Sequence, residues 1–369
     1  MNRREWLRSA ALGAAGLAVG GCAPGRGDPG AWAVATPRRF VRPRVGWDRV
    51  IRTVVGLRPF RPGGFVVRPE RIGGTLVVHN YGHGGGGVTL SWGTAELAVR
   101  EVFRTDAEEV AVLGCGAVGL ATARLLQRRG RRVTIYARDL PPETTSNVAG
   151  AQWSPYSVFD EDEADSGFLP RFREATHLAY RHFQDLLGPR YGVRWVDNFY
   201  VRSEPIELPP WMTSMDNVFS DVEEVPPSDH PFPRPYCTRV RTMFVEPATY
   251  LRAMVDEVRA AGGRIEVREL RSAEEVLELP EWVVVNCTGL GSRALFGDEE
   301  LVPVKGQLTV LEPQAELDYL LLAGRLYMFP RSDGVLLGGT FQEGEWSLEP
   351  DRTAERRVME GHLELFGAG

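Results

Sequence analysis

The stretch EEVAVLGCGAVGLATARLLQRRGRRVTIYARDL, residues 108–140, predicts the fold class. An apolar strand leads into Gly114, Gly116 and Gly119, an amphipathic helix follows, and a second strand covers residues 132–137. The first two glycines suit a tight turn and the close approach of a pyrophosphate, and the third suits close packing of the helix on the strand. In this context the pattern indicates a βαβ dinucleotide-binding unit, with a purely structural turn as the alternative.

Two charged residues follow the second strand. Asp139 lies about twenty residues after the last glycine of the motif, where a carboxylate takes ribose hydroxyls, and Arg138 beside it could face a phosphate. These two positions leave FAD and NADP both open. The next segment offers Gln152 and Trp153, an amide and an aromatic suited to a ring system, and hydroxyl groups suited to a pyrophosphate; a plain loop is the alternative. Those hydroxyl residues are Thr144, Thr145 and Ser146.

A second glycine-rich stretch, HNYGHGGGGVTLSWG, covers residues 79–93. Glycine lets backbone N–H groups approach a ligand without obstruction by a Cβ atom, and a helix starting at TAELAVREVF, residues 94–103, would add the positive end of its dipole. A flexible linker is the alternative. The strand-like GGTLVVHNY before the run and the apolar residues after it favour a place inside a core. We therefore expect the run to hold an electron-rich ligand.

Composition bounds the class of protein. The 369 residues are 43% hydrophobic and 25% charged, which is typical of a globular chain long enough for two domains. A formal net charge of -6 argues against a nucleic-acid partner. Lys305 is the only lysine, so a single arginine carries little information here. No cysteine spacing indicates a metal site, and His79 and His83 lack a third ligand, so we interpret both as structural and predict no metal.

The rest of the chain completes the predicted architecture. Helices are predicted at residues 172–187 and 248–261, and a buried strand beginning at Trp282 is predicted to return to the parallel sheet. LVPVKGQLTVL, RLYMFPR and GVLLGGTFQ predict strands of a more antiparallel domain, and residues 351–366 predict a closing helix. The predicted fold class is α/β: a Rossmann-like domain with a parallel sheet plus a mostly antiparallel α+β domain.

The N-terminal segment is predicted to be a targeting sequence. Arg3 and Arg4 precede a small-residue apolar stretch that resembles a twin-arginine export signal, and the stretch is too short and weakly hydrophobic to serve well as a membrane span. It ends in VGGC, which resembles a lipobox and implies lipidation at Cys22; plain cleavage or a retained anchor are the alternatives. Residues 23–38 read as a tether, and structure is expected from Phe40. These features predict an exported protein, on the periplasmic side or as a cell-envelope lipoprotein, that touches a membrane only through that anchor.

Several pieces of the chain together resemble the D-amino-acid oxidase family of FAD flavoenzymes, which includes the D-aspartate oxidases. The resemblance covers nearly everything from Phe40 onward, and HNYGHGGGG is its most specific motif. It implies FAD as the cofactor and a small-molecule D-amino acid and O2 as reactants, and it leaves a homodimer open. The pieces are GLRPFRP, HNYGHGGGGVTLSWG, LGCGAVGLATARLL, YARDLPPETTSNVAGAQW, VVNCTG, KGQ and LYMFPRSDGVLLGGTFQ.

The order of these pieces departs from the family. In family members the GxGxxG segment opens the chain and the GLRPFRP and HNYGHGG segments close it, whereas here both precede it. A circular permutation, with residues 103–109 joining the old ends, explains this order more simply than a chimera or a truncated tandem, because each segment occurs once. It predicts that residues 79–99 pack beside the Gly114 loop. The predicted parts are signal and tether, 1–38; FAD-binding domain, 58–186 and 247–305; and substrate domain, 39–57, 187–246 and 306–369.

Matching motifs assign the substrate contacts. Arg58 resembles the arginine that grips the substrate α-carboxylate, and Tyr327 the tyrosine that shares it; a planar guanidinium can hold a carboxylate by two parallel hydrogen bonds. Without the resemblance, Arg58, at the predicted end of a strand before Pro59, reads as a surface arginine and Tyr327 as a core aromatic. The carbonyl of Gly85 would accept from the substrate amine. Ala323 stands where many members carry a second tyrosine, which implies a more open pocket.

The candidate cofactor contacts come from both glycine motifs, the segment after the second strand and two later positions. They are Gly84, Gly86, Gly87, Val88, Thr89, Gly114, Gly116, Ala117, Val118, Gly119, Arg138, Asp139, Thr144, Thr145, Ser146, Gln152, Trp153, Leu270 and Thr288. Backbone donors of residues 84–89, at a helix N-terminus, would stabilise the negative charge of a reduced flavin near N1 and O2.

The reaction that the resemblance implies is oxidative deamination. A hydride passes from Cα to flavin N5, the amino group stabilises the developing imine, O2 is reduced to hydrogen peroxide, and the imino acid hydrolyses to a keto acid and ammonia. Positioning supplies most of the catalysis, since no acid or base residue is needed. The alternatives are a glycine or sarcosine type of amine oxidase, an NADP-dependent reductase, and an exported flavoprotein without catalysis.

Overall fold

The computed structural model describes residues 40–205, 210–215, 217–219 and 221–367, so the predicted signal and tether lie outside the described residues. The chain from Phe40 onward forms one compact unit built on two β-sheets. Strand β1 (Val50–Phe60) crosses the predicted boundary between residues 57 and 58. The predicted domain ranges otherwise stay predictions.

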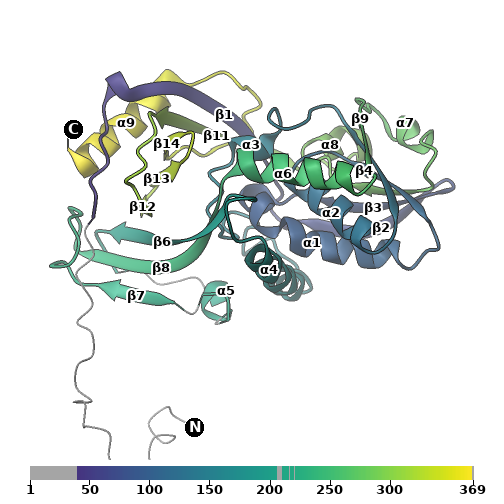
Figure 1. Ribbon diagram of the computed structural model, residues 1–369, viewed down its shortest axis with the longest axis horizontal. Coiled ribbons are helices and arrows are strands. Elements are labelled where there is room, and N and C mark those ends of the chain that lie inside the picture. The colour runs from purple at the N-terminus through teal and green to yellow at the C-terminus, as the bar shows by residue number, and fades with distance from the viewer. Residues whose placement is uncertain (1–39, 206–209, 216, 220, 368–369) are drawn as a thin grey trace, which may run out of the picture. The chain divides into compact units, whose positions relative to one another are not determined.

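The GxGxxG stretch forms the predicted βαβ unit. Strand β4 (Glu109–Leu113), helix α2 (Ala117–Arg128) and strand β5 (Arg132–Ala137) follow one another, and β4 and β5 are parallel neighbours (Figure 1). They belong to a six-stranded sheet in which, among the pairings described, β2 with β3 is antiparallel and the others are parallel. The order is β2 (Val66–Ile72), β3 (Thr75–Tyr81), β10 (Val283–Asn286), β4, β5 and β9 (Arg264–Val267).

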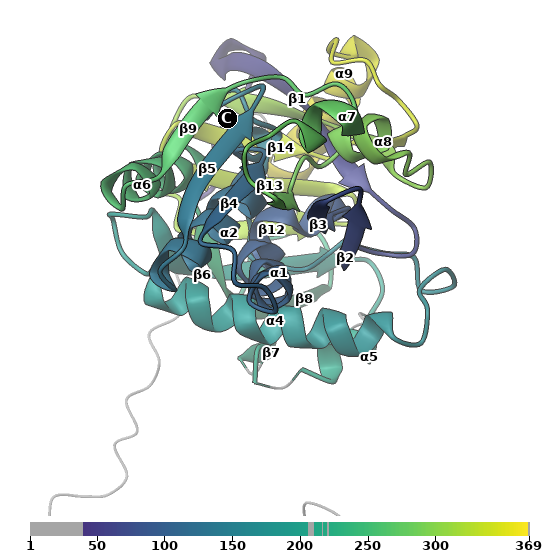
Figure 2. The same cartoon turned by 90° about the vertical axis from the view of Figure 1, so that its right-hand side faces the viewer.

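Both faces of this parallel sheet are buried, as expected for βαβ units. Val110 and Val112 of β4 share an apolar cluster with one group of helices, whereas Ala111 and Leu113 point the other way and pack with Val276. Figure 2 shows α1 and α2 on one side of the sheet and α7 and α8 on the other. The longer helices of the first group, besides α2, are α1 (Gly87–Val102), α4 (Phe168–Asp185) and α6 (Pro247–Ala260), and the shorter ones on the opposite face are α7 (Ala273–Leu277) and α8 (Gly291–Phe296).

The HNYGHGGGG stretch lies in the same sheet as the GxGxxG loop. His79 of β3 pairs with Asn286 of β10, and Asn286 pairs with Leu113 at the end of β4. Helix α1 packs with α2 in one apolar cluster. The predicted packing of residues 79–99 beside the Gly114 loop is therefore confirmed.

Helix α1 begins at Gly87, whereas the sequence predicted a start at Thr94. The stretch GVTLSWG has low helix propensity because of its glycines, but tertiary packing overrides it. A Cβ atom on Gly93 would lie 1.8 Å from the carbonyl oxygen of Ala175 in α4, so glycine permits the close contact of the two helices. The helix N-terminus consequently lies directly after the glycine run.

The second sheet is mostly antiparallel, as predicted, with β12 and β6 its parallel pair among the pairings described. Its order is β1, β11 (Val302–Leu311), β14 (Gly334–Gly338), β13 (Leu326–Arg331), β12 (Tyr319–Ala323), β6 (Val193–Arg202), β8 (Tyr236–Val245) and β7 (Val222–Val225), with β15 (Gln342–Glu343) beside β11. One face packs on the closing helix α9 (Arg352–Phe366) (Figure 1), and the other carries a cluster that includes Leu308, Phe329 and Leu336.

Strand β1 does not end at Arg58 as predicted. It continues through Pro59, which lies opposite Pro303, to Phe60 opposite Val302. Proline is tolerated here because β1 is the edge strand of its sheet and has β11 as its only neighbour in the strand order. Arg58 is therefore held within a paired strand.

The remaining short elements connect the two sheets and their helices. No helix among the described residues has both the length and the apolar composition needed to cross a membrane. The short elements are η2 (Trp47–Arg49), η3 (Gly84–Gly86), α3 (Thr145–Val148) and α5 (Pro210–Thr213).

Candidate active site

Two glycines of the GxGxxG loop lie where a side chain would not fit. A Cβ atom on Gly114, whose φ is +98°, would lie 2.6 Å from the carbonyl oxygen of Cys287, and one on Gly119 would lie 2.0 Å from the carbonyl oxygen of Gly114. Gly116 is the residue that precedes α2. The loop thus has the close backbone approach and the helix N-terminus that a dinucleotide phosphate requires.

The hydroxyl-rich segment reaches the same helix end. The backbone N–H of Ala117, the first residue of α2, donates to Ser146 Oγ over 3.0 Å, and Thr144 Oγ1 donates to Asn147 Oδ1 over 2.8 Å. Ser146 and Thr145 lie on the four-residue helix α3. The structure therefore brings this predicted pyrophosphate segment to the N-terminus of α2.

Arg138 and Asp139 lie just beyond the carboxyl end of β5, as predicted. Arg138 Nε donates to Asp139 Oδ2 over 2.8 Å, and the arginine is exposed. Leu270 packs at the other face of the sheet, against the cluster that contains Leu113 and Tyr136. All three residues lie near strand ends of the dinucleotide sheet, which is where ligands bind in such sheets.

Thr288 belongs to a chain of polar contacts that the sequence did not predict. Its Oγ1 donates to Asn286 Oδ1 over 2.7 Å, Asn286 Nδ2 donates to His79 Nδ1 over 3.1 Å, and His79 Nε2 lies 3.1 Å from Glu70. Burial lowers the pKa of His79, which keeps it neutral as this contact to its Nδ1 requires. His79 and Asn286 are cross-strand partners of adjacent parallel strands, a relation that sequence spacing does not reveal.

His83 is also engaged by the protein. Its ring stacks on Phe65, and its Nε2 lies 2.8 Å from Thr94 Oγ1. Burial lowers the pKa of His83 to about 3. Among the described residues, no group of three or more histidine, cysteine or acidic side chains is placed to hold a metal ion.

The glycine run lies against the segment that follows Trp153. Gly84 has a φ of +52°, and a Cβ atom there would lie 2.2 Å from the carbonyl oxygen of Ser157. The N–H of Gly85 donates to that same carbonyl over 2.8 Å, and Gly85 is exposed. Thr89 Oγ1 donates to the carbonyl of Ser154 and accepts from its N–H. The predicted cradle residues Gly86, Gly87 and Val88 lie between these anchored points at the start of α1.

Gln152 and Trp153 point to different surroundings. The Trp153 indole is 1% exposed and packs with Tyr180 and Phe219, so its ring is a core side chain. Gln152 is partly exposed, and its Nε2 donates to the hydroxyl of Tyr200 over 3.3 Å.

The two predicted substrate residues lie over glycines on one face of the antiparallel sheet. A Cβ atom on Gly306 would lie 2.5 Å from Arg58 Nη2, and one on Gly338 would lie 2.0 Å from Tyr327 Cζ. Tyr327 and Val54 of β1 pack against the same apolar cluster, and Arg58 follows Val54 by four residues, so both predicted side chains lie on the same face of the sheet. We call the region over Gly306 and Gly338, which Arg58 and Tyr327 occupy, the substrate bay. Strand glycines opposite large side chains are the signal that could have revealed it.

The Arg58 guanidinium carries an unsatisfied donor. Its Nη1 atom is buried and has no hydrogen-bond partner among the described residues. Buried polar groups in native proteins are nearly always paired, and an orphaned one needs an explanation. A carboxylate in the bay would supply the missing acceptor.

The expectation for Ala323 is corrected by the structure. Ala323 is 2% exposed and packs in the cluster on the α9 face of the sheet, so it does not bound the bay. Leu322, which pairs with Tyr327, occupies the bay face instead. Strand residues alternate between faces, and a match by distance along the chain ignored that alternation.

An aromatic pocket adjoins this bay. Phe60 lies two residues beyond Arg58 on the same strand, and the register of β15 on β11, continued by one residue, places Phe341 opposite Gly306. The lining residues are Phe60, Pro155, Tyr156, Ser157, Val158, Phe159, Asp160, Glu161, Trp211 and Phe341. Two of them, Tyr156 and Ser157, also border the glycine run.

Comparison with known proteins agrees with this geometry. Residues 109–368 match the DAO family, described as FAD dependent oxidoreductase. Over 260 residues the chain is 39% identical to a D-amino-acid oxidase of Rubrobacter xylanophilus, covering 67% of this chain and 74% of that protein. It is 31% identical to a D-aspartate oxidase of Homo sapiens, covering 69% and 74%.

The fold is shared with solved structures. A glycine oxidase from Geobacillus kaustophilus superposes with a TM-score of 0.53 at 17% identity, over 70% of this chain and 78% of that one. The glycine loop, the helix N-terminus and the family match are mutually consistent. The chain therefore belongs to the DAO family of FAD-dependent oxidoreductases, and FAD is its cofactor.

Proposed function

We propose that this protein is an oxidase of D-amino acids. The observation that carries the proposal is the buried Nη1 of Arg58, which has no hydrogen-bond partner in the described part of the chain and lies over Gly306, on the sheet face that Tyr327 shares. The names of the relatives, D-amino-acid oxidase and D-aspartate oxidase, support the same reaction class. The structurally similar glycine oxidases are under 25% identical in sequence, so they support the fold but not the substrate.

The chain's own groups bind and orient the substrate. Arg58 holds the α-carboxylate, the hydroxyl of Tyr327 donates to it, and the carbonyl of Gly85 accepts from the amine, which together fix the direction of the Cα–H bond. Bound FAD would supply the hydride acceptor for Cα and the route for the two electrons to O2, which would give hydrogen peroxide. The N-terminus of α1, directly after the glycine run, would offer backbone donors to the negative charge of a reduced flavin.

The adjoining pocket favours neutral substrates. A substrate side chain leaving the bay meets aromatic residues, including Phe60, Trp211 and Phe341. The charged residues among its described lining are Asp160 and Glu161, which repel a second carboxylate. We therefore expect apolar D-amino acids to be oxidised faster than D-aspartate or D-glutamate.

A substrate panel tests the reaction. The FAD-loaded protein is incubated with D-phenylalanine, D-leucine, D-aspartate, glycine and sarcosine while peroxide is followed. Turnover of the apolar D-amino acids supports the proposal, faster turnover of glycine or sarcosine favours the amine-oxidase alternative, and a fully loaded protein that oxidises none of them refutes the oxidase function.

We also propose that the chain is a circular permutation of the family order. The family match begins at residue 109, although β1, β2 and β3 precede it and belong to the two sheets, and α1, which also precedes it, packs against β3. About a quarter of the Rubrobacter protein lies outside the matched region. The ends of the folded unit also lie together, since Phe40 and Phe366 share one apolar cluster and a Cβ on Gly367 would lie 2.9 Å from Arg42 Nη2.

We further propose that the protein is exported and anchored by lipid at Cys22. The support is the pair Arg3 and Arg4, the apolar stretch and the VGGC that ends it. Mass spectrometry of membrane-associated protein, compared with Cys22→Ala, tests the anchor. A wild-type N-terminus without acyl chains would contradict it.

A further inference from the structure

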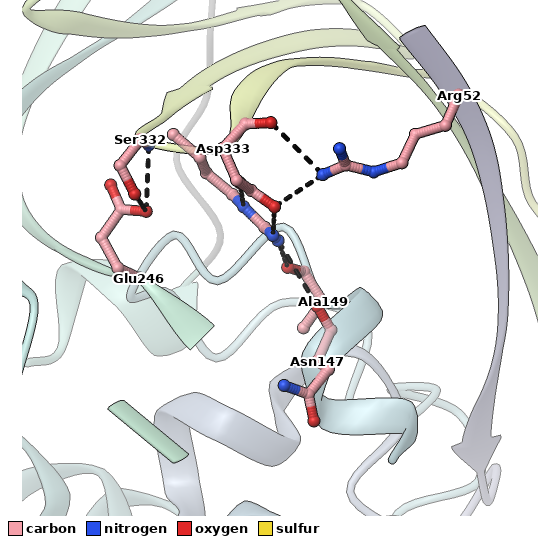
Figure 3. Close-up of polar contacts among 7 residues, drawn as sticks. Arg52, Asn147, Ala149, Glu246, Ser332 and Asp333 are labelled. Atoms are coloured by element: carbon pink, nitrogen blue, oxygen red, sulfur yellow. Dashed lines mark hydrogen bonds and ion pairs between the residues drawn. The ribbon is translucent and has the colours of Figure 1, made fainter. Parts of the chain in front are cut away.

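One buried arginine connects the substrate sheet with the cofactor segment. Arg331, at the end of β13, binds Asp333 through two hydrogen bonds, Nε to Oδ1 over 2.7 Å and Nη2 to Oδ2 over 2.6 Å. Its Nη1 donates to the carbonyl oxygens of Asn147 and Ala149, over 3.4 and 3.2 Å. Figure 3 shows Asp333, in the turn between β13 and β14, on one side of these contacts and Asn147 and Ala149, at the end of α3, on the other.

The turn itself is anchored independently. Ser332 donates from its N–H and its Oγ to Glu246 Oε2, and Glu246 also accepts from Arg194. Arg52 on β1 adds an exposed ion pair to Asp333 over 2.6 Å. The Arg331 side chain is 6% exposed, so its pairing with Asp333 is shielded from solvent on the arginine side. Arg331 therefore extends from a fixed support.

The segment that Arg331 holds has little structure of its own. Helix α3 has four residues, and its position depends on contacts with other elements. Those contacts serve both halves of the site: Ser146 accepts from Ala117 at the start of α2, and Val148 lies over Gly56 of β1. A Cβ on Gly150 would lie 2.9 Å from the Phe329 ring, which stacks on Tyr327.

We propose that Arg331 is a positioning residue that sets the placement of residues 144–150 between the cofactor loop at Ala117 and the substrate bay at Tyr327. Its forked guanidinium is suited to this role because it binds one carboxylate by two parallel hydrogen bonds and still reaches two carbonyl oxygens with its third nitrogen. This role could not be predicted from the sequence, because neither carbonyl is identifiable without the fold. The inference rests on the proposed function for its substrate readout and on the family's FAD for its cofactor readout.

The test compares variants in two assays, titration of apoprotein with FAD and steady-state kinetics at saturating FAD. Arg331→Met is expected to weaken FAD binding at least tenfold and to raise the KM for the best D-amino acid several-fold. Arg331→Lys is expected to restore neither, because an ammonium group cannot bind all three partners. Asp333→Asn keeps the side-chain shape and is expected to give an intermediate loss in both assays.

Arg52→Met is the matched control, since it removes the exposed partner of the same carboxylate and leaves the Arg331 contacts intact; it is expected to stay within twofold of wild type in both assays. If Arg331→Met and Arg331→Lys lower the melting temperature but leave FAD affinity and KM unchanged, Arg331 is only structural and the proposal is overturned. If Arg331→Met does not fold, Arg331→Lys and Asp333→Asn decide by the same criteria. A wild-type protein that binds FAD but oxidises no amino acid refutes the proposed function. The FAD titrations of the Arg331 variants still test the positioning role in that case.

Discussion

Arg58 offers a direct test at the scale of one residue. Arg58→Leu removes the group proposed to pair with the substrate carboxylate, so we expect a higher KM and slower flavin reduction, at a combined cost of about 3 to 5 kcal/mol. Rapid-reaction measurements of flavin reduction, alongside steady-state kinetics, give this number. Arg49→Leu, which removes an exposed partner of Glu312, is the control and should change neither value more than twofold. Unchanged kinetics in Arg58→Leu would show that the carboxylate binds elsewhere.

His83 makes stability depend on pH. Its pKa is about 3 in the folded protein, against an ordinary value of 6.5, because it is buried beside neutral partners. Since the folded pKa is depressed, the stabilisation is complete above pH 6.5 and is lost as the pH falls toward 3. The advantage of wild type over His83→Gln in free energy of unfolding should therefore shrink by about 2 kcal/mol between pH 7.5 and pH 5. Denaturant unfolding at the two pH values measures it, and a constant difference would contradict the assignment.

At the scale of elements, Gly119 controls how closely α2 approaches β4. A methyl group there would lie 2.0 Å from the carbonyl oxygen of Gly114, so Gly119→Ala must displace the helix from the strand. We expect a loss of stability of about 1 to 3 kcal/mol and FAD binding weakened at least tenfold. Gly74→Ala, in the turn between β2 and β3, meets nothing within 4 Å and is the control. Equal FAD affinity in the two variants would argue against the loop as the phosphate site.

The elements also show where sequence reasoning succeeds. The βαβ unit was predictable because its strand, glycines and helix are consecutive and each signal is local. The start of α1 was not, because Gly93 is required by a contact with Ala175 that only the fold brings about. The prediction for Ala323 was wrong because strand residues alternate between the two faces of a sheet. The Arg331 contacts were not predictable because Asn147 and Ala149 lie 184 and 182 residues away along the chain.

For the whole molecule, the permutation proposal can be tested by undoing it. A chain opened between Thr105 and Asp106, with Gly367 joined to Phe40 by a short flexible linker, should fold, bind FAD and unfold at nearly the same temperature as residues 40–369. The reason is that the ends share one cluster and that Phe103, Arg104 and Asp106 of the opened loop are exposed. Flavin content and thermal melts measure the outcome. A product that cannot bind FAD would count against the permutation.

The sequence predicted the fold class, a parallel sheet plus a mostly antiparallel one, and the structure confirms that class. The bay was only partly predictable. Arg58 and Tyr327 came from motif resemblance, but Gly306 and Gly338, which make room for their side chains, lie on other strands and emerge only from cross-strand register.

The edge position of β1 has a dynamic consequence. The strand that carries Arg58 is hydrogen-bonded to β11 alone in the strand order, so it can open locally without unfolding the dinucleotide sheet. A carboxylate bound at Arg58 would oppose that opening. Hydrogen exchange with mass spectrometry should then show slower amide exchange in β1 when a carboxylate such as benzoate is added to the FAD-loaded protein, with little change in β4. Equal slowing in both strands would mean that ligand binding stabilises the protein globally rather than its edge.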